Sequence, residues 1–385
     1  MNPLQNRRIL LIDDMPSIYE DFRKILIPMH RSTPAEPAIS SPTPPSSRTE
    51  KGNQAMKAIR FIFIAMFAFA AYAAKGHAEP VTLIFVHGAA PTHPTHLAAM
   101  QFAKRVEQRT DGQIKFDIFP AGQLGGENEA LQKIRLGAIA MGTTAPSNLI
   151  KYEKAFAVVI MPYLFDSYEH AHRVLDGPAM SWLAPLAEKQ GFVILSNWEW
   201  GFRHVTNNQR PINQPEDMRG LKIRVPPVVQ LEDTMKALDA QISKIAFKEL
   251  YMALSQGVVD GQENPLHVIY YNKLYEVQKH LALTQHVYHN QLHLISVKSW
   301  AMLTPEQQKI VREESKAAGD GMSKGMIAEE DELIAKMVNA GVKVTRPDLK
   351  AFRAKVEPAV KEITAYAGEA NVQKFLKMVE DGRKK

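Results

Sequence analysis

Residues 219–226 read Arg-Gly-Leu-Lys-Ile-Arg-Val-Pro, which is the pattern of a short β-strand between Gly220 and Pro226. Apolar residues alternate with Lys222 and Arg224, so the apolar side chains share one face and the two basic side chains share the other. A strand holds the base of Arg224 firmly, and a planar guanidinium matches a carboxylate with two parallel hydrogen bonds. Taken alone, this stretch favours the simpler interpretation that Arg224 is a surface residue pointing at water. The rest of the chain is needed to decide between a carboxylate-binding and a surface position for Arg224.

The composition is that of an ordinary globular protein. The chain has 385 residues, 45% hydrophobic and 23% charged, which leaves room for two domains of typical size. The absence of Cys excludes disulfides, thiolate catalysis and Cys-type zinc sites. The net charge is +6, but residues 1–78 hold ten Lys/Arg and six Asp/Glu, so 37 Lys/Arg face 35 Asp/Glu in the remainder. With no basic run interleaved with aromatics, we expect no nucleic-acid partner.

The first 55 residues resemble a fragment of another protein class. Residues 8–26 are similar to the opening strand and helix of response-regulator receiver domains, with Asp13 and Asp14 in the place of the acidic pair. No later strand supplies the phosphoacceptor Asp, and a Pro/Ser-rich linker follows at residues 31–47. We therefore predict that residues 1–55 are not part of the functional protein.

Residues 56–78 have the three-part layout of a secretory signal peptide. Two basic residues precede an apolar run at residues 61–74, and small residues then occupy the positions that a signal peptidase reads. The apolar run is short for a transmembrane helix, although a retained membrane anchor is the alternative. We expect cleavage after Ala78 and a periplasmic location.

Strand and helix patterns alternate in the rest of the chain. Alternation of this kind is typical of a parallel α/β sheet. The glycine-rich turn at residues 120–126 lacks the spacing of a phosphate-binding loop, so we interpret it as a structural turn that opens a helix. Strands are expected at residues 81–86, 113–119, 138–142, 192–196 and 221–225, and helices around residues 97–106, 127–137, 168–175, 178–189, 230–238 and 248–256.

Two polar and aromatic stretches are candidates for a binding site. Trp198, Glu199 and Trp200 lie where the first domain hands over to the second, and they could pack in a core or form the wall of a ligand cleft. Residues 257–265 read as a strand followed by a loop with amide and carboxylate side chains, at a place where an open α/β sheet leaves a crevice.

Other chemistries are less well supported. His286, His289 and His293 have helical metal-ligand spacing, but the surrounding alternation predicts a strand with His286 and His289 on opposite faces. We expect no metal or other cofactor. His87-Gly88 is an oxyanion-loop dipeptide, yet the chain has no Gly-x-Ser-x-Gly nucleophile motif. A secreted hydrolase acting on a carboxylated small molecule remains the alternative, and it predicts turnover of the bound substrate.

Five stretches together resemble the extracytoplasmic solute-binding proteins of tripartite ATP-independent periplasmic (TRAP) transporters, which are binding proteins and not enzymes. The resemblance runs from about residue 81 to the end of the chain. The stretches are Ala-Gly-Gln-Leu-Gly-Gly at 121–126, Gly-Phe-Arg at 201–203, residues 218–226, Val-Asp-Gly-Gln-Glu-Asn-Pro-Leu at 259–266, and Tyr-Glu-Val-Gln-Lys at 275–279.

The resemblance implies a two-domain periplasmic binding protein fold of the α/β class. It implies hinge strands, a long helix that spans both domains, and a ligand cleft between them. Domain I would consist of residues 79–200 and 290–329, and domain II of residues 201–289 and 330–385. The implied partner is a membrane permease with a small and a large integral subunit, and the binding protein itself would be a monomer.

The resemblance also assigns roles to individual residues. Arg224 would form a salt bridge with the ligand carboxylate, Arg203 and Asn264 would lie beside that carboxylate, and Phe247 would pack on the ligand. Trp198, Glu199 and Trp200 complete the candidate site, and closure of the domains would bury the ion pair under the aromatic residues.

Two departures argue against sialic acid as the ligand. The sialic-acid binders have an acidic contact in the strand that matches residues 139–144, where this chain reads Gly-Thr-Thr at its end. Their early Asn contact is replaced by Gly88. We therefore expect a dicarboxylate or a sugar acid.

Overall fold

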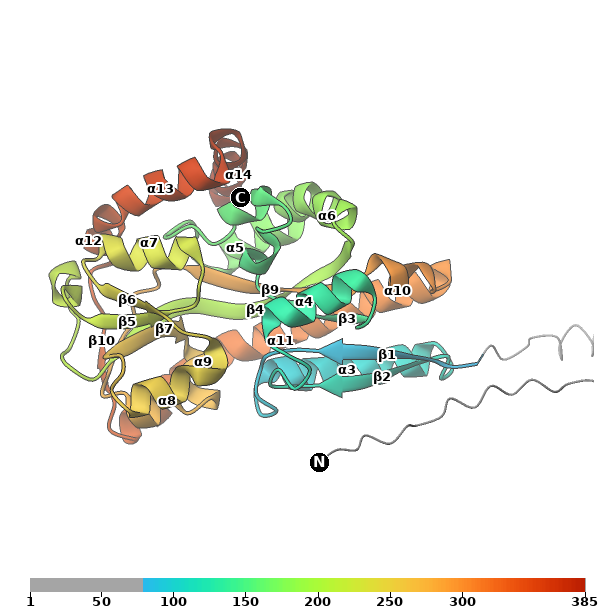
Figure 1. The fold of residues 1–385 in the computed structure, drawn as a ribbon, viewed down its shortest axis with the longest axis horizontal. Coiled ribbons are helices and arrows are strands. Elements are labelled where there is room, and N and C mark those ends of the chain that lie inside the picture. The colour runs from blue at the N-terminus through green and yellow to red at the C-terminus, as the bar shows by residue number, and fades with distance from the viewer. Residues whose placement is uncertain (1–78, 385) are drawn as a thin grey trace, which may run out of the picture. The chain divides into compact units, whose positions relative to one another are not determined.

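Strand β4 (Phe192–Asn207) joins the two halves of the fold in the computed structural model, which describes residues 79–384 (Figure 1). Its first part pairs antiparallel with β9 (Tyr288–Ser296), and its last part pairs antiparallel with β7 (Gly261–Pro265) and β8 (His280–Ala282). The strand expected at residues 192–196 therefore continues much further, because its central part is buried on both faces. β4 thus belongs to both lobes.

The first lobe is built on the sheet half β2-β1-β3-β9-β4. β1 pairs parallel with both β2 and β3, as the strand and helix pattern predicts. β3 begins three residues later than expected because α4 ends at Gly137 in the left-handed conformation (φ 80°) and residues 138 and 139 still bond back to Lys133. The elements are β1 (Val81–Val86), α3 (Pro94–Arg109), β2 (Ile114–Phe119), α4 (Glu127–Leu136), β3 (Met141–Thr144) and α10 (Val297–Ala301).

The second lobe is built on the sheet half β4-β7-β5-β6, with β8 and β10 attached to β4. β5 pairs parallel with β6 and β7, and its Ile223 and Val225 are buried as the alternation predicts. The further elements are β5 (Lys222–Val225), α7 (Val229–Ala237), β6 (Gln241–Lys244), α8 (Leu250–Ser255), α9 (Leu266–Tyr271) and β10 (Lys343–Thr345).

The long helix α11 (Pro305–Asn339) contacts both lobes, as the family resemblance implies. A capping box between Thr304 and Gln307 begins the helix. Near its start, Glu313 pairs with Arg109 of α3 at 2.7 Å, and further along Glu329 accepts a hydrogen bond from Tyr271 of α9 at 2.7 Å. The helix is continuous, with Gly319, Gly321 and Gly325 accommodated within it.

The C-terminal helices touch elements of both lobes. α13 (Glu357–Ala367) packs against α7, and α14 (Glu369–Arg383) packs against α5 (Tyr168–Val174). Gly368, whose φ of 89° favours glycine, separates α13 from α14. The proposed domain boundaries stay predictions, since residues 349–383 bridge the two lobes. The remaining helices are α6 (Met180–Lys189) and α12 (Leu349–Lys355).

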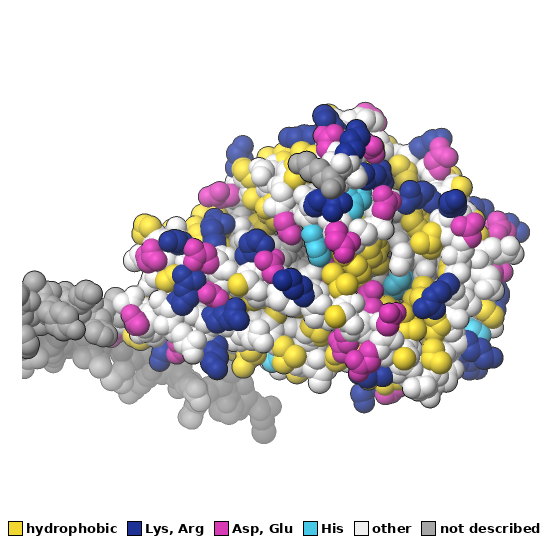
Figure 2. All heavy atoms as spheres, turned by 180° about the vertical axis from the view of Figure 1, so that it is seen from behind, with side chains coloured by type: hydrophobic (Ala, Val, Ile, Leu, Met, Phe, Trp, Pro, Cys, Tyr) yellow, Lys and Arg dark blue, Asp and Glu magenta, His cyan; other side chains and the backbone are white. Residues whose placement is uncertain are grey.

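The predictions for residues 1–78, the receiver-like fragment and the signal peptide, lie outside the described residues. Within residues 79–384, none of the helices combines the length and apolar character needed to span a membrane. Figure 2 shows acidic and basic side chains interspersed over one face of the molecule. The charge pattern of that face therefore matches the near balance of charges in this part of the sequence.

Candidate ligand-binding site

The two sets of parallel strands point their carboxyl ends at one another. β3 is antiparallel to β9, and β9 is antiparallel to β4, so β3 points along β4 toward the second lobe. β7 is antiparallel to β4, so β7 and its parallel neighbour β5 point back toward the first lobe. Ligands of open α/β sheets bind at the carboxyl ends of the strands. The site is therefore expected between these two sets of strand ends.

The strand register gives the size of this interval. β3 ends at Thr144, which is level with Asn197 of β4 through their common partner Leu292. β7 ends at Pro265, which is level with Arg203 of β4. Six residues of strand span roughly 20 Å at about 3.3 Å per residue. This distance accommodates side chains from both lobes and a small organic molecule between them.

Arg224 is at the carboxyl end of β5 and is only 1% exposed, so it does not point at water. Its Nε donates a hydrogen bond to the Ile245 carbonyl at 2.8 Å. Its two terminal nitrogens make no hydrogen bond to any other described residue. Burial and the charge of Arg203 lower the pKa of Arg224 to about 10, against the effect of Glu263 and Glu127, so the guanidinium stays charged at neutral pH.

Arg203 is held by a dense buried network. Its guanidinium forms an ion pair with Glu263, and its terminal nitrogens also donate to the Asn264 side chain at 3.1 Å and contact His289 Nδ1 at 2.8 Å. Burial opposes ionisation of Glu263, but the charge of Arg203 and the hydrogen bonds from His286 and Arg203 outweigh it and lower the pKa of Glu263 to about 2. Arg203 is therefore fixed in place and largely satisfied by the protein.

Asn264 and Phe247 also lie at strand ends of the second lobe. Asn264 is buried in β7 and bonds to both Arg203 and the Gln262 side chain. Phe247 begins the short helix η6 (Phe247–Glu249), directly after β6, and is 39% exposed. An aromatic ring this exposed at the end of a strand is available to pack on a ligand.

Glu127, which the sequence reasoning missed, is the first-lobe residue that faces the two arginines. It is the first residue of α4, and its Oε2 accepts a hydrogen bond from Asn148 Nδ2 at 2.6 Å. The pKa of Glu127 is raised because it is buried, although the hydrogen bond from Asn148 and the charges of Arg203 and Arg224 limit the rise. The sequence did contain a signal for Glu127, because it is an acidic residue directly after the glycine-rich turn that follows the carboxyl end of a parallel strand.

Trp200, on β4, contacts a residue that in turn touches the second lobe. Its ring lies 4.9 Å from that of His93, in the loop before α3, and His93 also contacts His267 and Tyr271 of α9. Trp200 is partly exposed, so it can still meet a ligand. Its contacts agree with a position at the boundary between the lobes.

Trp198 and Glu199 make their contacts with residues other than Arg203 and Arg224. Trp198 is 1% exposed, packs on Phe85, and donates from its indole nitrogen to the Ser315 carbonyl at 3.1 Å. Glu199 is buried and accepts hydrogen bonds from Tyr288, Ser323 and His172. Their role in ligand binding stays a prediction that these contacts do not support.

The prediction that His286 and His289 point to opposite faces is wrong. His286 Nε2 lies 3.2 Å from Glu263 Oε2, and His289 contacts Arg203, so both reach the same ion pair. The reason is that β9 begins only at Tyr288, after a turn in which Gln285 has φ 44°, so strand alternation does not extend to His286. Residues 79–384 contain no group of three His, Asp or Glu side chains arranged to hold a metal ion.

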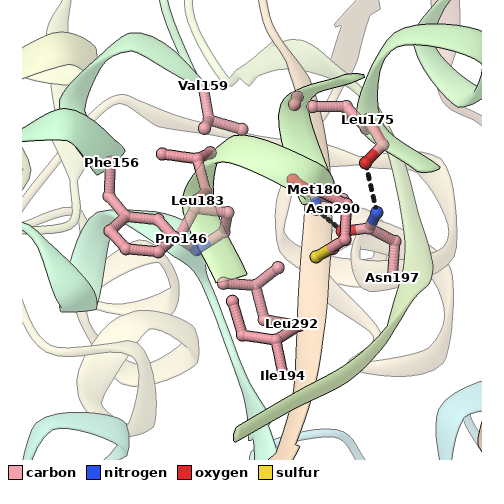
Figure 3. A pocket seen from close by; sticks show the side chains of 11 residues that line it. Pro146, Phe156, Val159, Leu175, Met180, Leu183, Ile194, Asn197, Asn290 and Leu292 are labelled. Carbon is pink, nitrogen blue, oxygen red and sulfur yellow. Dashed lines mark hydrogen bonds between the residues drawn. The ribbon is translucent and has the colours of Figure 1, made fainter. Parts of the chain in front are cut away.

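An apolar pocket lies beside β4 and β9, near the first-lobe end of this interval (Figure 3). Its polar members are Asn197, which bonds to the Leu175 carbonyl at 3.0 Å, and Asn290, which donates to Asn197 at 2.7 Å. Apolar side chains such as Phe156 and Leu183 form the rest of its wall. With no charged side chain in its lining, this pocket is poorly suited to hold an acid.

The sequence profile of the family "Bacterial extracellular solute-binding protein, family 7" matches residues 85–366. The chain belongs to this family of TRAP transporter solute-binding proteins. It is 32% identical over 324 residues to the sialic acid-binding periplasmic protein SiaP of Vibrio cholerae, which covers 84% of this chain and all of SiaP.

Solved TRAP solute-binding proteins share the fold. The protein from Sulfitobacter sp. with bound β-D-galacturonate matches with a TM-score of 0.75 and 28% identity, over 78% of this chain and all of that one. The sugar acid binding protein DctPAm from Advenella mimigardefordensis, in complex with galactonate, matches with a TM-score of 0.76 and 29% identity, over 79% of this chain and 99% of that one.

Membership of the family of TRAP solute-binding proteins confirms the predicted two-domain α/β fold. Its members are substrate-binding components of transporters and not enzymes, so the alternative of a secreted hydrolase is wrong. The family is periplasmic.

Proposed function

We propose that this protein is exported to the periplasm, captures a small organic acid and delivers it to a TRAP permease with a small and a large membrane subunit. The ligand class is a sugar acid or a dicarboxylate. Structural relatives carry galacturonate and galactonate, which supports an acid as the ligand. Arg203, Asn264 and Phe247 would surround the ligand in this proposal, and Trp200 would lie at its edge.

The observation that carries the proposal is the state of Arg224. It is buried and charged at a strand end, and neither of its terminal nitrogens has a hydrogen-bond partner among the described residues. A carboxylate would satisfy both nitrogens with two parallel hydrogen bonds. A buried guanidinium without such a partner is costly, so ligands lacking a carboxylate would not stabilise the closed form.

Replacement of Arg224 tests this clamp. We expect Arg224→Ala to weaken binding by roughly two to three decades, because it truncates one partner of a buried charge pair. Arg224→Lys is expected to fail as well, since a point charge cannot form the two-pronged contact. A thermal-shift screen of dicarboxylates, uronates, aldonates and aromatic acids would first supply a ligand, and calorimetry would then measure its dissociation constant.

The matched control is Arg219→Ala. Arg219 precedes the same strand, but its side chain is 72% exposed and makes only a 3.6 Å ion pair with Asp239. Its loss should leave binding unchanged. An Arg224 variant with the dissociation constant of the natural chain would refute the clamp.

A further inference from the structure

The site contains one carboxylate that the arginine clamp does not use. Glu127 accepts a hydrogen bond from Asn148 at 2.6 Å. An ionised carboxylate has about four acceptor positions, so part of its capacity is still free for donors from a ligand. Its place at the start of α4 also favours the negative charge, because helix N-termini stabilise anions.

Gly88, which follows β1, lies next to the Glu127 carboxylate. A Cβ atom at position 88 would lie 3.5 Å from Glu127 Oε1, which is van der Waals contact. A long side chain at this position would compete with a ligand for the surroundings of the carboxylate, whereas glycine adds no side-chain atoms there.

The charges of the site are balanced before a ligand arrives. Arg203 and Glu263 form a buried ion pair, which leaves the charge of Arg224 to be set against that of Glu127. A ligand with one carboxylate adds one negative charge, at Arg224. A ligand with two carboxylates adds a second negative charge on the side of Glu127, and like charges placed together oppose binding strongly.

Two lysines act on a neighbouring carboxylate instead. Lys133 pairs with Glu129 at 2.6 Å and is the main cause of the lowered pKa of Glu129, and the charge of exposed Lys248 adds to this effect. Arg203 and Arg224 are the cations that act on Glu127. A second ligand carboxylate would therefore face Glu127 without a dedicated cation from the described residues.

We infer that Glu127 selects acids that carry one carboxylate and a hydroxyl group at the far end, and rejects acids with a second carboxylate there. A hydroxyl donates a hydrogen bond to Glu127, whereas a carboxylate can only accept. This inference rests on the proposed function, since Arg224 must hold the first carboxylate.

Two pairs of acids test the inference. Galactonate and galactarate share six carbons and their configuration, but the far end is CH2OH in the first and a carboxylate in the second; erythronate and meso-tartrate are the four-carbon pair. By calorimetry, the natural chain should bind the monoacid of at least one pair at least about tenfold more tightly than the matching diacid.

Glu127→Gln should reduce this preference to about threefold or less, mainly through tighter binding of the diacid, because the like-charge repulsion is gone. The control is Glu129→Gln, two residues further along the same helix, where the side chain is 59% exposed. This control should keep the full preference. Thermal unfolding of both variants checks that they fold as the natural chain does.

The outcomes separate the two proposals. If the diacids bind the natural chain as tightly as the monoacids, and Arg224→Ala abolishes both, the inference about Glu127 is wrong and the clamp stands. An unchanged preference in Glu127→Gln also overturns it, as does a chain that binds neither member of either pair. If Arg224→Ala binds these acids as tightly as the natural chain, the proposed function itself fails.

Discussion

At the scale of single residues, the two buried arginines have different surroundings. Arg203 has Glu263, Asn264 and His289 as partners, whereas Arg224 is bonded only through its Nε to a backbone carbonyl. A satisfied, buried ion pair contributes geometry more than affinity, because its charges are already compensated. This difference is the reason that the proposed clamp uses Arg224, with Arg203 holding the surrounding side chains in place.

This division predicts a stability defect for Glu263→Gln. The change removes the charge that compensates buried Arg203, and breaking a buried pair in this way costs about 3 to 5 kcal/mol. Urea unfolding followed by tryptophan fluorescence would measure the loss. Glu362→Gln, at an exposed position of α13, should change stability by less than about 0.5 kcal/mol. A Glu263→Gln protein as stable as this control would show that the pair is not important for stability.

At the scale of elements, α11 approaches β4 closely because of one glycine. A Cβ atom at Gly319 would lie 2.8 Å from the Asn197 carbonyl oxygen and 2.9 Å from the Trp198 ring. Gly321 and Gly325 of the same helix have nothing within 4 Å of such an atom. Close packing thus explains only the first of these three glycines.

The three glycines supply a matched experiment. Gly319→Ala should destabilise the protein by about 1 to 2 kcal/mol, because overpacking against β4 exceeds the gain in helix propensity. Gly321→Ala should stabilise it by about 0.5 to 1 kcal/mol, since only the propensity changes. Thermal or urea unfolding of the two variants checks both signs. Equal effects at the two positions would contradict the close approach of α11 and β4.

At the scale of the whole molecule, the fold keeps many histidines neutral. Burial lowers the pKa of His87 and His267 to about 4, and that of His204, His289 and His293 to about 3. In the unfolded chain these groups take up protons near pH 6.5, so acid favours unfolding. Glu330 acts in the opposite direction, because burial raises its pKa to about 7, and the pKa values of His172, Asp176 and Glu127 are raised as well. The histidines outnumber these groups, because burial also lowers the pKa of His93, His280 and His286.

We therefore expect the free energy of unfolding to fall by roughly 3 kcal/mol or more between pH 6.5 and 5.5. The stability from the histidines is present above pH 6.5 and is lost as the pH falls toward their folded pKa values. Urea unfolding at several pH values would measure the slope, and His293→Gln should reduce it by about one proton. A flat profile over this range would contradict the neutral, buried state of these side chains.

Local sequence pattern was sufficient to place most elements, including the strand that carries Arg224. The alternation around Arg224 predicted its strand, and Gly137 predicted the end of α4, because strand period and helix capping depend on neighbours in sequence. Motif resemblance added Arg203, Asn264 and Phe247, which the fold places at the same end of the second-lobe strands.

Contacts between side chains that are far apart in the chain could not be predicted from the sequence. Arg203 lies 60 residues from Glu263 and 86 from His289, and Glu127 belongs to the other lobe, so no local pattern relates their charges. The same limit applies to Trp198, whose apolar ring suited either a core or a ligand wall until its contacts with Phe85 and Ser315 were known. Secondary structure followed from the order of the residues, whereas the charge balance around Arg224 follows from how β4 brings the two lobes together.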